Sequence, residues 1–506
     1  MDSRQPRARL RGSGDAATRL ALAAARRAIL AVAVVLPAPA AFAQDAPRQQ
    51  AVGSADCRPG DLPAARYERR FGPLTDRELA MARTAWKYFE NNTQPTGLAN
   101  AVDNYPSTTM WDTASYLGAI VAARELQLVT PQQADERLAK AIGALGSLSF
   151  FRDELPNKVY QTKTLEKVDY GNKPGEIGFS ALDLGRLLVW LKIVKERYPQ
   201  HADAVDRFVL RWKWGHVVDR SGMMFGAILD KDRKLQYVQE GRLGYEEYAA
   251  KGFQLWGIPT ELASRPEPYT TVPIYCVEVP YDSRDPRKFY QHNYVVTESY
   301  ALDGIEFNWD LALDRDADDR RHTHAWMLDF ANRVYQAQEN RWKATGILTA
   351  RSEHQLDAEP YFVYDTVFTD GYAWNTITEP GQYVPQFAAV SLKAALGMWA
   401  LWKSDYTDRL FDEIVKQADP QRGWMEGILE NGKGPIRAFT ANNNGIMLET
   451  LLFKAQGKLL KWGAGRGDSL WDRNFRGSPY GPLGSTAGTP APCARPSASA
   501  PGTAPC

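Results

Sequence analysis

Apolar residues recur three and four positions apart along most of the chain between residues 74 and 462, which is the spacing of one face of an α-helix. A Thr or Asp often stands just before such a run, as expected of a residue that caps a helix N-terminus. The pattern predicts helices at 76–91, 109–128, 131–148, 177–197, 202–214, 244–256, 295–305, 318–342, 386–402, 407–417 and 443–460. Strand signal is weak, and short extended pieces are expected at 223–229, 272–279 and 347–350.

The predicted helices alternate in character. Six are rich in Ala, Gly, Ser and large apolar residues and begin at residues 109, 177, 244, 295, 386 and 443, whereas five carry charge on one face and begin at residues 76, 131, 202, 318 and 407. Helices that are apolar all round are buried, and outer helices keep a polar stripe. The alternation predicts an all-α fold, an (α/α)6 toroid of six inner helices ringed by outer ones, with short β pieces in loops. The sequence shows no outer helix between the third and fourth inner helices, at residues 257–294.

The two ends of the chain differ from its centre. The first 43 residues have the features of an export signal, with a basic lead, an apolar run over 28–36 and Ala41-Phe42-Ala43 before the expected cut. We therefore expect a periplasmic or secreted protein, and no later apolar run is long enough to span a membrane. The predicted organisation is a signal peptide (1–43), a flexible lead-in (44–73), one toroid domain (74–462) and a disordered tail rich in Pro, Ala, Ser and Gly (463–506).

The net charge argues against a nucleic-acid partner. The export signal holds seven Arg and two Asp, so removing its net +5 from a chain of net +1 leaves about −4. The four cysteines match no zinc spacing. Cys493 and Cys506 bracket part of the tail, where a small disulfide loop and no disulfide at all are both open. The sequence predicts no metal site and no cofactor, and it leaves the oligomeric state open.

Candidate chemistry gathers where the predicted inner helices begin. In a toroid these helices run the same way, so their N-terminal ends, with their unpaired amides, share one mouth. Aromatic rings pack on sugar faces, and carboxylates and amides bond sugar hydroxyls, so a polysaccharide or oligosaccharide substrate is expected. Large helical proteins bury Trp and Tyr in any case, so the cluster carries more weight than any one member. The substrate-binding candidates are Trp111, Glu176, Tyr245, Glu246, Tyr300, Tyr361, Asp365, Trp374, Trp424, Asn442, Asn443 and Asn444.

Hydrolysis of a glycosidic bond needs one protonated carboxyl that donates to the leaving oxygen and a second carboxylate that activates water or attacks carbon. Glu246 and Glu247 are adjacent in a predicted first turn and diverge by about 100°, so they cannot point at one target. Our hypothesis is Glu247 as proton donor, with its pKa raised by burial, and Glu426 as base. Asp112 and Glu298 are sugar ligands or substitutes for either role. Acids also favour helix N-termini for purely structural reasons.

Four short stretches resemble motifs of an uncharacterised bacterial domain family: Gly-Tyr-Glu-Glu-Tyr at 244–248, Thr-Glu-Ser-Tyr at 297–300, Gly-Trp-Met-Glu at 423–426 and Thr-Ala-Asn-Asn-Asn-Gly-Ile at 440–446. That family is similar in turn to the glucoamylase-like domains of cyclic β-1,2-glucan synthases and to bacterial endo-β-1,2-glucanases. The resemblance implies an (α/α)6 fold and, through the Gly-Tyr-x-Glu stretch, a general acid at Glu247. The chain departs from the glucanases just after Glu247, where it reads Tyr-Ala-Ala-Lys-Gly.

Three functions remain open on the sequence. The favoured one is an exported glycoside hydrolase or transglycosylase that acts on a bacterial glucan by carboxylate acid/base catalysis. The second is a polysaccharide lyase acting on a uronate polymer, because His292-Asn293-Tyr294 supplies residues that can neutralise a uronate and move a proton. The third is a non-catalytic glycan-binding or assembly protein, in which the acids only ligate sugar and binding occurs without turnover.

Overall fold

The structure is a computed structural model, and it describes residues 67–240, 242–289, 291–315, 321–463 and 469–475. The predicted signal peptide, most of the predicted lead-in and most of the predicted tail lie outside these ranges. Within the described residues, no helix is long and apolar enough to cross a membrane.

The helices predicted to be apolar are the buried ones. They are α3 (Met110–Glu125), α5 (Ala181–Arg197), α7 (Tyr245–Gln254), α9 (Glu298–Phe307), α11 (Leu392–Leu401) and α13 (Ala441–Gln456). Each contacts the next in chain order, and α13 contacts α3, so the contacts among the six helices close on themselves. Two glycines let the backbones of α5 and α7 approach closely: a Cβ added to Gly252 of α7 would lie 2.0 Å from the Gly185 carbonyl oxygen of α5.

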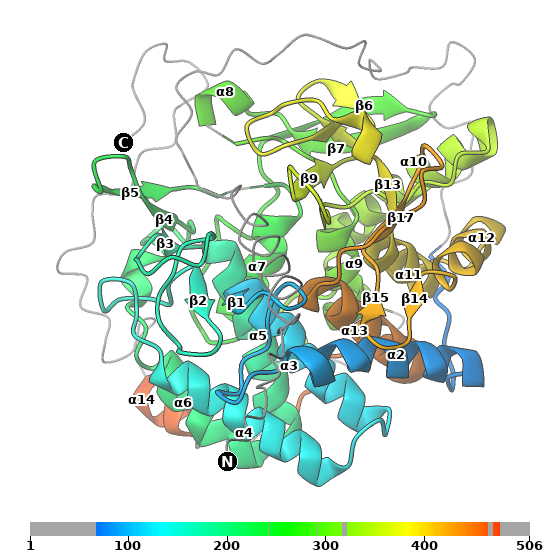
Figure 1. The fold of residues 1–506 in the computed structure, drawn as a ribbon. Coiled ribbons are helices and arrows are strands. Elements are labelled where there is room, and N and C mark those ends of the chain that lie inside the picture. The colour runs from blue at the N-terminus through cyan, green and yellow to red at the C-terminus, as the bar shows by residue number, and fades with distance from the viewer. Residues whose placement is uncertain (1–66, 241, 290, 316–320, 464–468, 476–506) are drawn as a thin grey trace, which may run out of the picture.

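Helices with one polar face pack against the outside of this group. They are α2 (Asp76–Asn92), α4 (Pro131–Ser147), α6 (Ala202–Val209), α10 (Ala325–Thr345) and α12 (Asp405–Ile414). In chain order they contact α13, α3, α5, α9 and α11. Between α7 and α9 the described chain forms the hairpin β6–β7 (Tyr269–Ile274 and Val277–Asp282) and the single-turn α8 (Pro286–Phe289). The predicted gap in the outer layer is therefore filled by a hairpin, which Figure 1 shows in the upper part of the view.

The loops contain more strand than the sequence suggests, all of it in antiparallel pairs among the described residues. The pairings are β1 (Ser107–Thr109) with β2 (Val159–Gln161); β3 (Gly178–Phe179) with β4 (Gly226–Leu229) and β5 (Leu235–Val238); β8 (His354–Gln355) with β9 (Phe362–Asp365) and β12 (Thr376–Ile377); β10 (Phe368–Thr369) with β11 (Tyr372–Ala373); β13 (Ala389–Ser391) with β16 (Gly427–Leu429) and β17 (Pro435–Ile436); and β14 (Ala418–Asp419) with β15 (Gly423–Trp424). The expected pieces at 223–229 and 272–279 fall on strands, whereas 347–350 forms none.

Two inner helices begin four or more residues later than predicted. Helix α5 begins at Ala181 rather than residue 177, because Gly178 and Phe179 pair with β4 and Ser180 caps the helix. Helix α11 begins at Leu392 rather than residue 386, because a 3-10 turn (Pro385–Phe387) and strand β13 occupy the preceding residues. The first shift matters for chemistry, since it places Asp183 in the first turn of α5.

A fully buried ion network joins the inner helices. Arg186 of α5 donates to Glu306 of α9 and to Glu449 of α13, each at 3.0 Å, and both carboxylates are 0% exposed. The same guanidinium donates to the Tyr248 hydroxyl of α7 at 3.1 Å and to the Ser115 hydroxyl of α3 at 3.2 Å. One side chain therefore connects five of the six inner helices.

Part of the segment predicted as a disordered tail is packed. Helix α14 (Leu470–Phe475) places Trp471 edge-on against Trp214 and Trp256, with ring centroids 5.7 and 5.1 Å apart. The Trp471 backbone amide donates to Asp206 Oδ2 at 2.8 Å. Two further short 3-10 helices lie at Pro199–His201 and Trp214–His216. Cys276 is disulfide-bonded, and the other three cysteines lie outside the described residues.

Candidate active site

The first turn of α3 carries an aromatic ring and an acid that solvent reaches. Thr109 caps this helix, and its hydroxyl lies 2.7 Å from Asp112 Oδ2 and 3.1 Å from the Asp112 backbone amide. Trp111 and Asp112 are both partly exposed. Enclosure by the protein raises the pKa of Asp112, while the Thr109 hydrogen bond and the charge of Lys393 oppose that rise. Asp112 thus belongs to a partly exposed residue, and Thr109 and Lys393 favour the charged form of its carboxyl.

The first turn of α5 repeats this arrangement. Ser180 caps the helix, and its hydroxyl lies 3.2 Å from Asp183 Oδ1 and 3.0 Å from Glu240 Oε2. Glu240 Oε2 also accepts from the backbone amide of Ala181 at 2.7 Å. Burial, followed by the negative charges of Glu240 and Asp112, raises the pKa of Asp183 to about 7. Asp183 is partly exposed, so it combines solvent access with the protonation of a general acid.

Behind these two acids lies a buried anion held by several donors. Glu298, the first residue of α9, is 2% exposed and forms an ion pair with Lys393 of α11. Its Oε1 accepts from Trp111 Nε1 at 3.2 Å and from Asn442 Nδ2 at 3.0 Å. Although burial opposes ionisation, Lys393 holds the pKa of Glu298 below its usual range. Glu298 is therefore a fixed carboxylate that orients Trp111 and Asn442.

Lys393 also reaches two other acids. Glu426 is 1% exposed and accepts a hydrogen bond from the Thr440 hydroxyl. Burial raises the pKa of Glu426 to about 7, against the opposing charge of Lys393. Glu353 is partly exposed, its Oε1 accepts from the Tyr245 hydroxyl at 3.0 Å, and its Oε2 has no hydrogen-bond partner in the described chain. Burial and the charge of Glu298 raise the pKa of Glu353.

Glu247 lies elsewhere, as a structural cap of α7. It is 0% exposed, its Oε2 accepts from the Gly244 amide at 2.7 Å, and its Oε1 accepts from the Glu267 amide at 3.1 Å. Burial raises the pKa of Glu247 to about 8. Burial and the adjacent Glu267 raise the pKa of Glu246, which is 1% exposed, well above its usual range. The carboxyl predicted as proton donor is thus turned into the protein and bonded to backbone.

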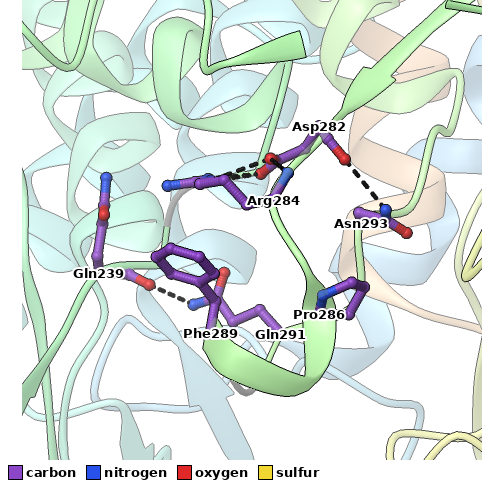
Figure 2. Close-up of a pocket in the computed structure, with 7 residues that line it drawn as sticks. All are labelled: Gln239, Asp282, Arg284, Pro286, Phe289, Gln291 and Asn293. Carbon is purple, nitrogen blue, oxygen red and sulfur yellow. Dashed lines mark hydrogen bonds and ion pairs between the residues drawn. The ribbon is translucent and has the colours of Figure 1, made fainter. Parts of the chain in front are cut away.

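A nearby cavity, lined by the arginine that pairs with Glu267, is too small for a sugar. Arg284 pairs with Glu267 at 3.1 Å and with Asp282, and it lines a cavity of about 10 Å³. Figure 2 shows Asp282 between Arg284 and Asn293, with Gln291 bonded to Gln239. Such a volume is at the lower limit for one water molecule. This cavity therefore does not admit a sugar ring.

Three other predicted ligands support the backbone. Trp424 is 2% exposed, and its indole Nε1 donates to the Met81 carbonyl. Asn443 and Asn444 are 0% exposed, and both side-chain amides donate to the Trp424 carbonyl, while Asn444 Oδ1 accepts from the Trp424 amide. These bonds fix the loop that carries Glu426. The Asn443 and Asn444 amide nitrogens and Asn444 Oδ1 are used in them, whereas Asn443 Oδ1 has no hydrogen-bond partner in the described chain.

The structure disperses the remaining predicted ligands. Glu176 is ion-paired with Lys167 outside α5. Asp365 is 0% exposed and paired with Arg351, and Tyr300 is 1% exposed in the core. Trp374 is 5% exposed and packs against the Arg341 guanidinium. Tyr361 lines a separate open groove. Of the predicted set, the structure brings together Trp111, Asp112, Tyr245, Glu298, Glu426 and Asn442.

Sequence reasoning missed Asp183, Glu353 and Lys393. A signal for Asp183 was present, because Ser180-Ala-Leu-Asp183 repeats the hydroxyl-x-x-Asp spacing of Thr109-Met-Trp-Asp112. Placing the start of the helix at residue 177 hid it. Glu353 lies in a loop and Lys393 lies in the apolar helix α11. Nothing in the sequence around either residue indicates that the two lie near Glu298 and Glu426.

The fold has known relatives among solved structures. It is similar to a putative glucoamylase from Bacteroides caccae (TM-score 0.53, 10% identity, 76% of this chain and 95% of that chain) and to an endo-β-1,2-glucanase from Chitinophaga pinensis solved with sophorotriose and glucose (TM-score 0.51, 11% identity, 76% of this chain and 94% of that chain). At these identities the likeness shows the fold alone. The chain is a helix-rich protein with a glucoamylase-like fold.

The family follows from the sequence. Residues 80–457 match the family described as "Protein of unknown function (DUF3131)". Because this match spans most of the chain, the chain belongs to that family. No curated protein matches the sequence. The resemblance to an uncharacterised bacterial family, and through it to glucoamylase-like and glucanase domains, is therefore confirmed.

Proposed function

We propose that this chain is an exported (α/α)6-toroid glycoside hydrolase or transglycosylase acting on a glucan, with Asp183 as proton donor and Asp112 as base. The observation that carries the proposal is the pair itself. Two partly exposed carboxyls occupy equivalent positions in the first turns of the contacting helices α3 and α5. The charge of Asp112 is one cause of the raised pKa of Asp183, at about 7.

The proposed chemistry moves one proton in each direction. The Asp183 carboxyl donates its proton to the glycosidic oxygen as that oxygen leaves the anomeric carbon. Asp112 accepts a proton from the attacking water, or from a sugar hydroxyl in a transglycosylation. Two environments separate the roles: Glu240, fixed by the backbone amide of Ala181, favours the protonated form of Asp183, whereas Thr109 and Lys393 favour the charged form of Asp112.

The neighbours of the pair suit an uncharged sugar. Trp111 offers a partly exposed ring for a pyranose face, and its indole is held by Glu298 and Asn442. Asn442 is itself partly exposed. Several carboxyls lie close by, so a uronate polymer would meet repulsion. His292 bonds Asp370 at 2.8 Å and the Glu379 carbonyl at 2.8 Å, an arrangement that gives the lyase alternative little support.

The fold and location also enter the proposal. Six inner helices with closed contacts, five outer helices and a hairpin in the remaining outer position fit a toroid, as does the likeness to the glucoamylase and glucanase structures. Export is supported by the sequence of residues 1–43 and by the disulfide at Cys276, since oxidising compartments preserve disulfides.

The test is product analysis with matched variants. The protein is incubated with a panel of glucans, β-1,2-linked ones included, and the products are identified by chromatography and mass spectrometry. Asp183→Asn and Asp112→Asn are each expected to lower turnover by at least ~10²-fold, the usual contribution of a general acid or base. Asp203→Asn, an exposed acid in the first turn of α6, is the control. Full activity in Asp183→Asn would refute the assignment, and binding without turnover by the unaltered protein would favour the non-catalytic alternative.

A further inference from the structure

A second concave surface lies at the turn between β8 and β9. It is an open groove of about 470 Å³, lined by Tyr361, Phe387, Gln382, Gln386, Thr378 and Glu359. This volume falls within the range of roughly 300–1,000 Å³ that is typical of ligand sites. None of these residues belongs to the group around Asp112 and Asp183.

The chemistry of the lining selects a class of ligand. Two aromatic rings provide flat apolar faces, and two amides and a hydroxyl provide donors and acceptors, which together match a pyranose ring and its hydroxyls. Among the described residues that line the groove there is no Lys or Arg, and Glu359 is the one charged residue. Phosphate, nucleic acid and uronate ligands would therefore find repulsion without a compensating cation.

The polar groups in the groove are available for binding. In the described chain, the side-chain amides of Gln382 and Gln386 and the hydroxyl of Tyr361 make no hydrogen bond to protein, and both Gln side chains belong to exposed residues. Sugar hydroxyls can therefore bond these three side chains without breaking internal contacts. The Thr378 hydroxyl already accepts from the Gln382 backbone amide at 3.1 Å.

The groove is held in a fixed shape. The Tyr361 backbone amide donates to the Ala358 carbonyl at 2.8 Å, and its carbonyl accepts from the Leu356 amide at 2.7 Å. These bonds keep Tyr361 at φ +64°, a conformation that a non-glycine residue adopts only when its surroundings enforce it. Val384 and Leu356 form part of a small buried cluster, on which Phe387 packs. A preformed site costs little ordering on binding.

We propose that this groove is a second glycan-binding site, which takes an uncharged stretch of the same polymer that the acids around Asp183 cleave. The inference rests on the proposed function for the identity of the polymer. Thr378, at one side of the groove, directly precedes Glu379, whose charge contributes to the raised pKa values of Tyr364 and Tyr170, and Asp183 also acts on Tyr170. A residue next in sequence to the groove and the proposed proton donor thus act on the same tyrosine.

The experiment measures binding and turnover separately. Isothermal titration of the full chain carrying Asp183→Asn with neutral glucan oligosaccharides is expected to show binding. Adding Tyr361→Ala is expected to weaken it about fivefold or more, from the loss of a ring contact, and Gln386→Ala, at an exposed side chain, tests the groove without a risk to folding. In the active protein, both changes should raise KM for long chains and leave kcat unchanged.

The control is Tyr269→Ala, which removes a 46% exposed ring on β6, away from the groove. Affinity unchanged in both Tyr361→Ala and Gln386→Ala would overturn the proposal, and so would tighter binding of an oligogalacturonate than of a neutral glucan. The failure of the proposed function has a different signature, because it appears as turnover retained in Asp183→Asn, whatever the groove variants do.

Discussion

Arg186→Met tests whether the inner helices depend on the ion network that joins them. Arg186, Glu306 and Glu449 are all 0% exposed, so removing the guanidinium leaves carboxyl groups buried without their cation. Breaking a buried ion pair from one side typically costs about 3–5 kcal/mol. A domain of about 390 residues has an unfolding entropy of roughly 0.8 kcal/mol/K, so a loss of about 4 kcal/mol corresponds to a fall in Tm of roughly 5 °C.

The assay is urea unfolding followed by far-ultraviolet circular dichroism, with calorimetry for Tm. The control is Lys87→Met, which breaks an i,i+3 ion pair with Glu90 on the surface of α2, where the two side chains are 37% and 43% exposed. That pair should contribute about 0.5 kcal/mol or less. A triple variant that adds Glu306→Gln and Glu449→Gln to Arg186→Met removes the unpaired carboxylates. It is expected to recover part of the lost free energy of unfolding. If Arg186→Met stays within about 1 kcal/mol of the unaltered protein, the network does not hold the helices as argued.

Three further predictions concern the acids. If Asp183 donates a proton, kcat/KM should fall as pH rises through about 7, where its carboxyl ionises; a pH profile that stays flat to pH 9 would contradict this. Glu247→Gln should keep activity, because the residue caps α7. Burial raises the folded-state pKa of Glu247 to about 8, so the unaltered protein should lose stability relative to Glu247→Gln as pH rises from about 4 to 8. Measurements of Tm at several pH values check this. Lys393→Met should destabilise the protein by about 3–5 kcal/mol at neutral pH, because it leaves Glu298 without its cation. Since Lys393 lowers the pKa of Glu298, this loss of unfolding free energy should shrink as pH falls below about 4. Denaturant unfolding at two pH values measures the change.

The sequence alone determined the helical character of this protein. Apolar spacing and caps such as Thr109 and Thr440 are local features, so α3 and α13 were predicted with starts within two residues of those observed. The alternation of apolar and charged helices likewise predicted which would be buried, because a helix enclosed by neighbours is largely apolar around its circumference. Asp112, Trp111 and Asn442 were found as site candidates because they stand at these well-defined starts.

Only the tertiary structure decided which acids share a site. Glu298, Lys393 and Asn442 are far apart in sequence, and they meet because α9, α11 and α13 pack side by side. The sequence does not distinguish a first-turn glutamate that faces solvent from one that bonds the backbone. Glu247 is of the second kind, because it accepts hydrogen bonds from the amides of Gly244 and Glu267. Asp183 lies in the first turn of α5 because residues 178 and 179 pair with β4 instead of continuing the helix. These outcomes depend on contacts between distant segments, which local periodicity does not encode.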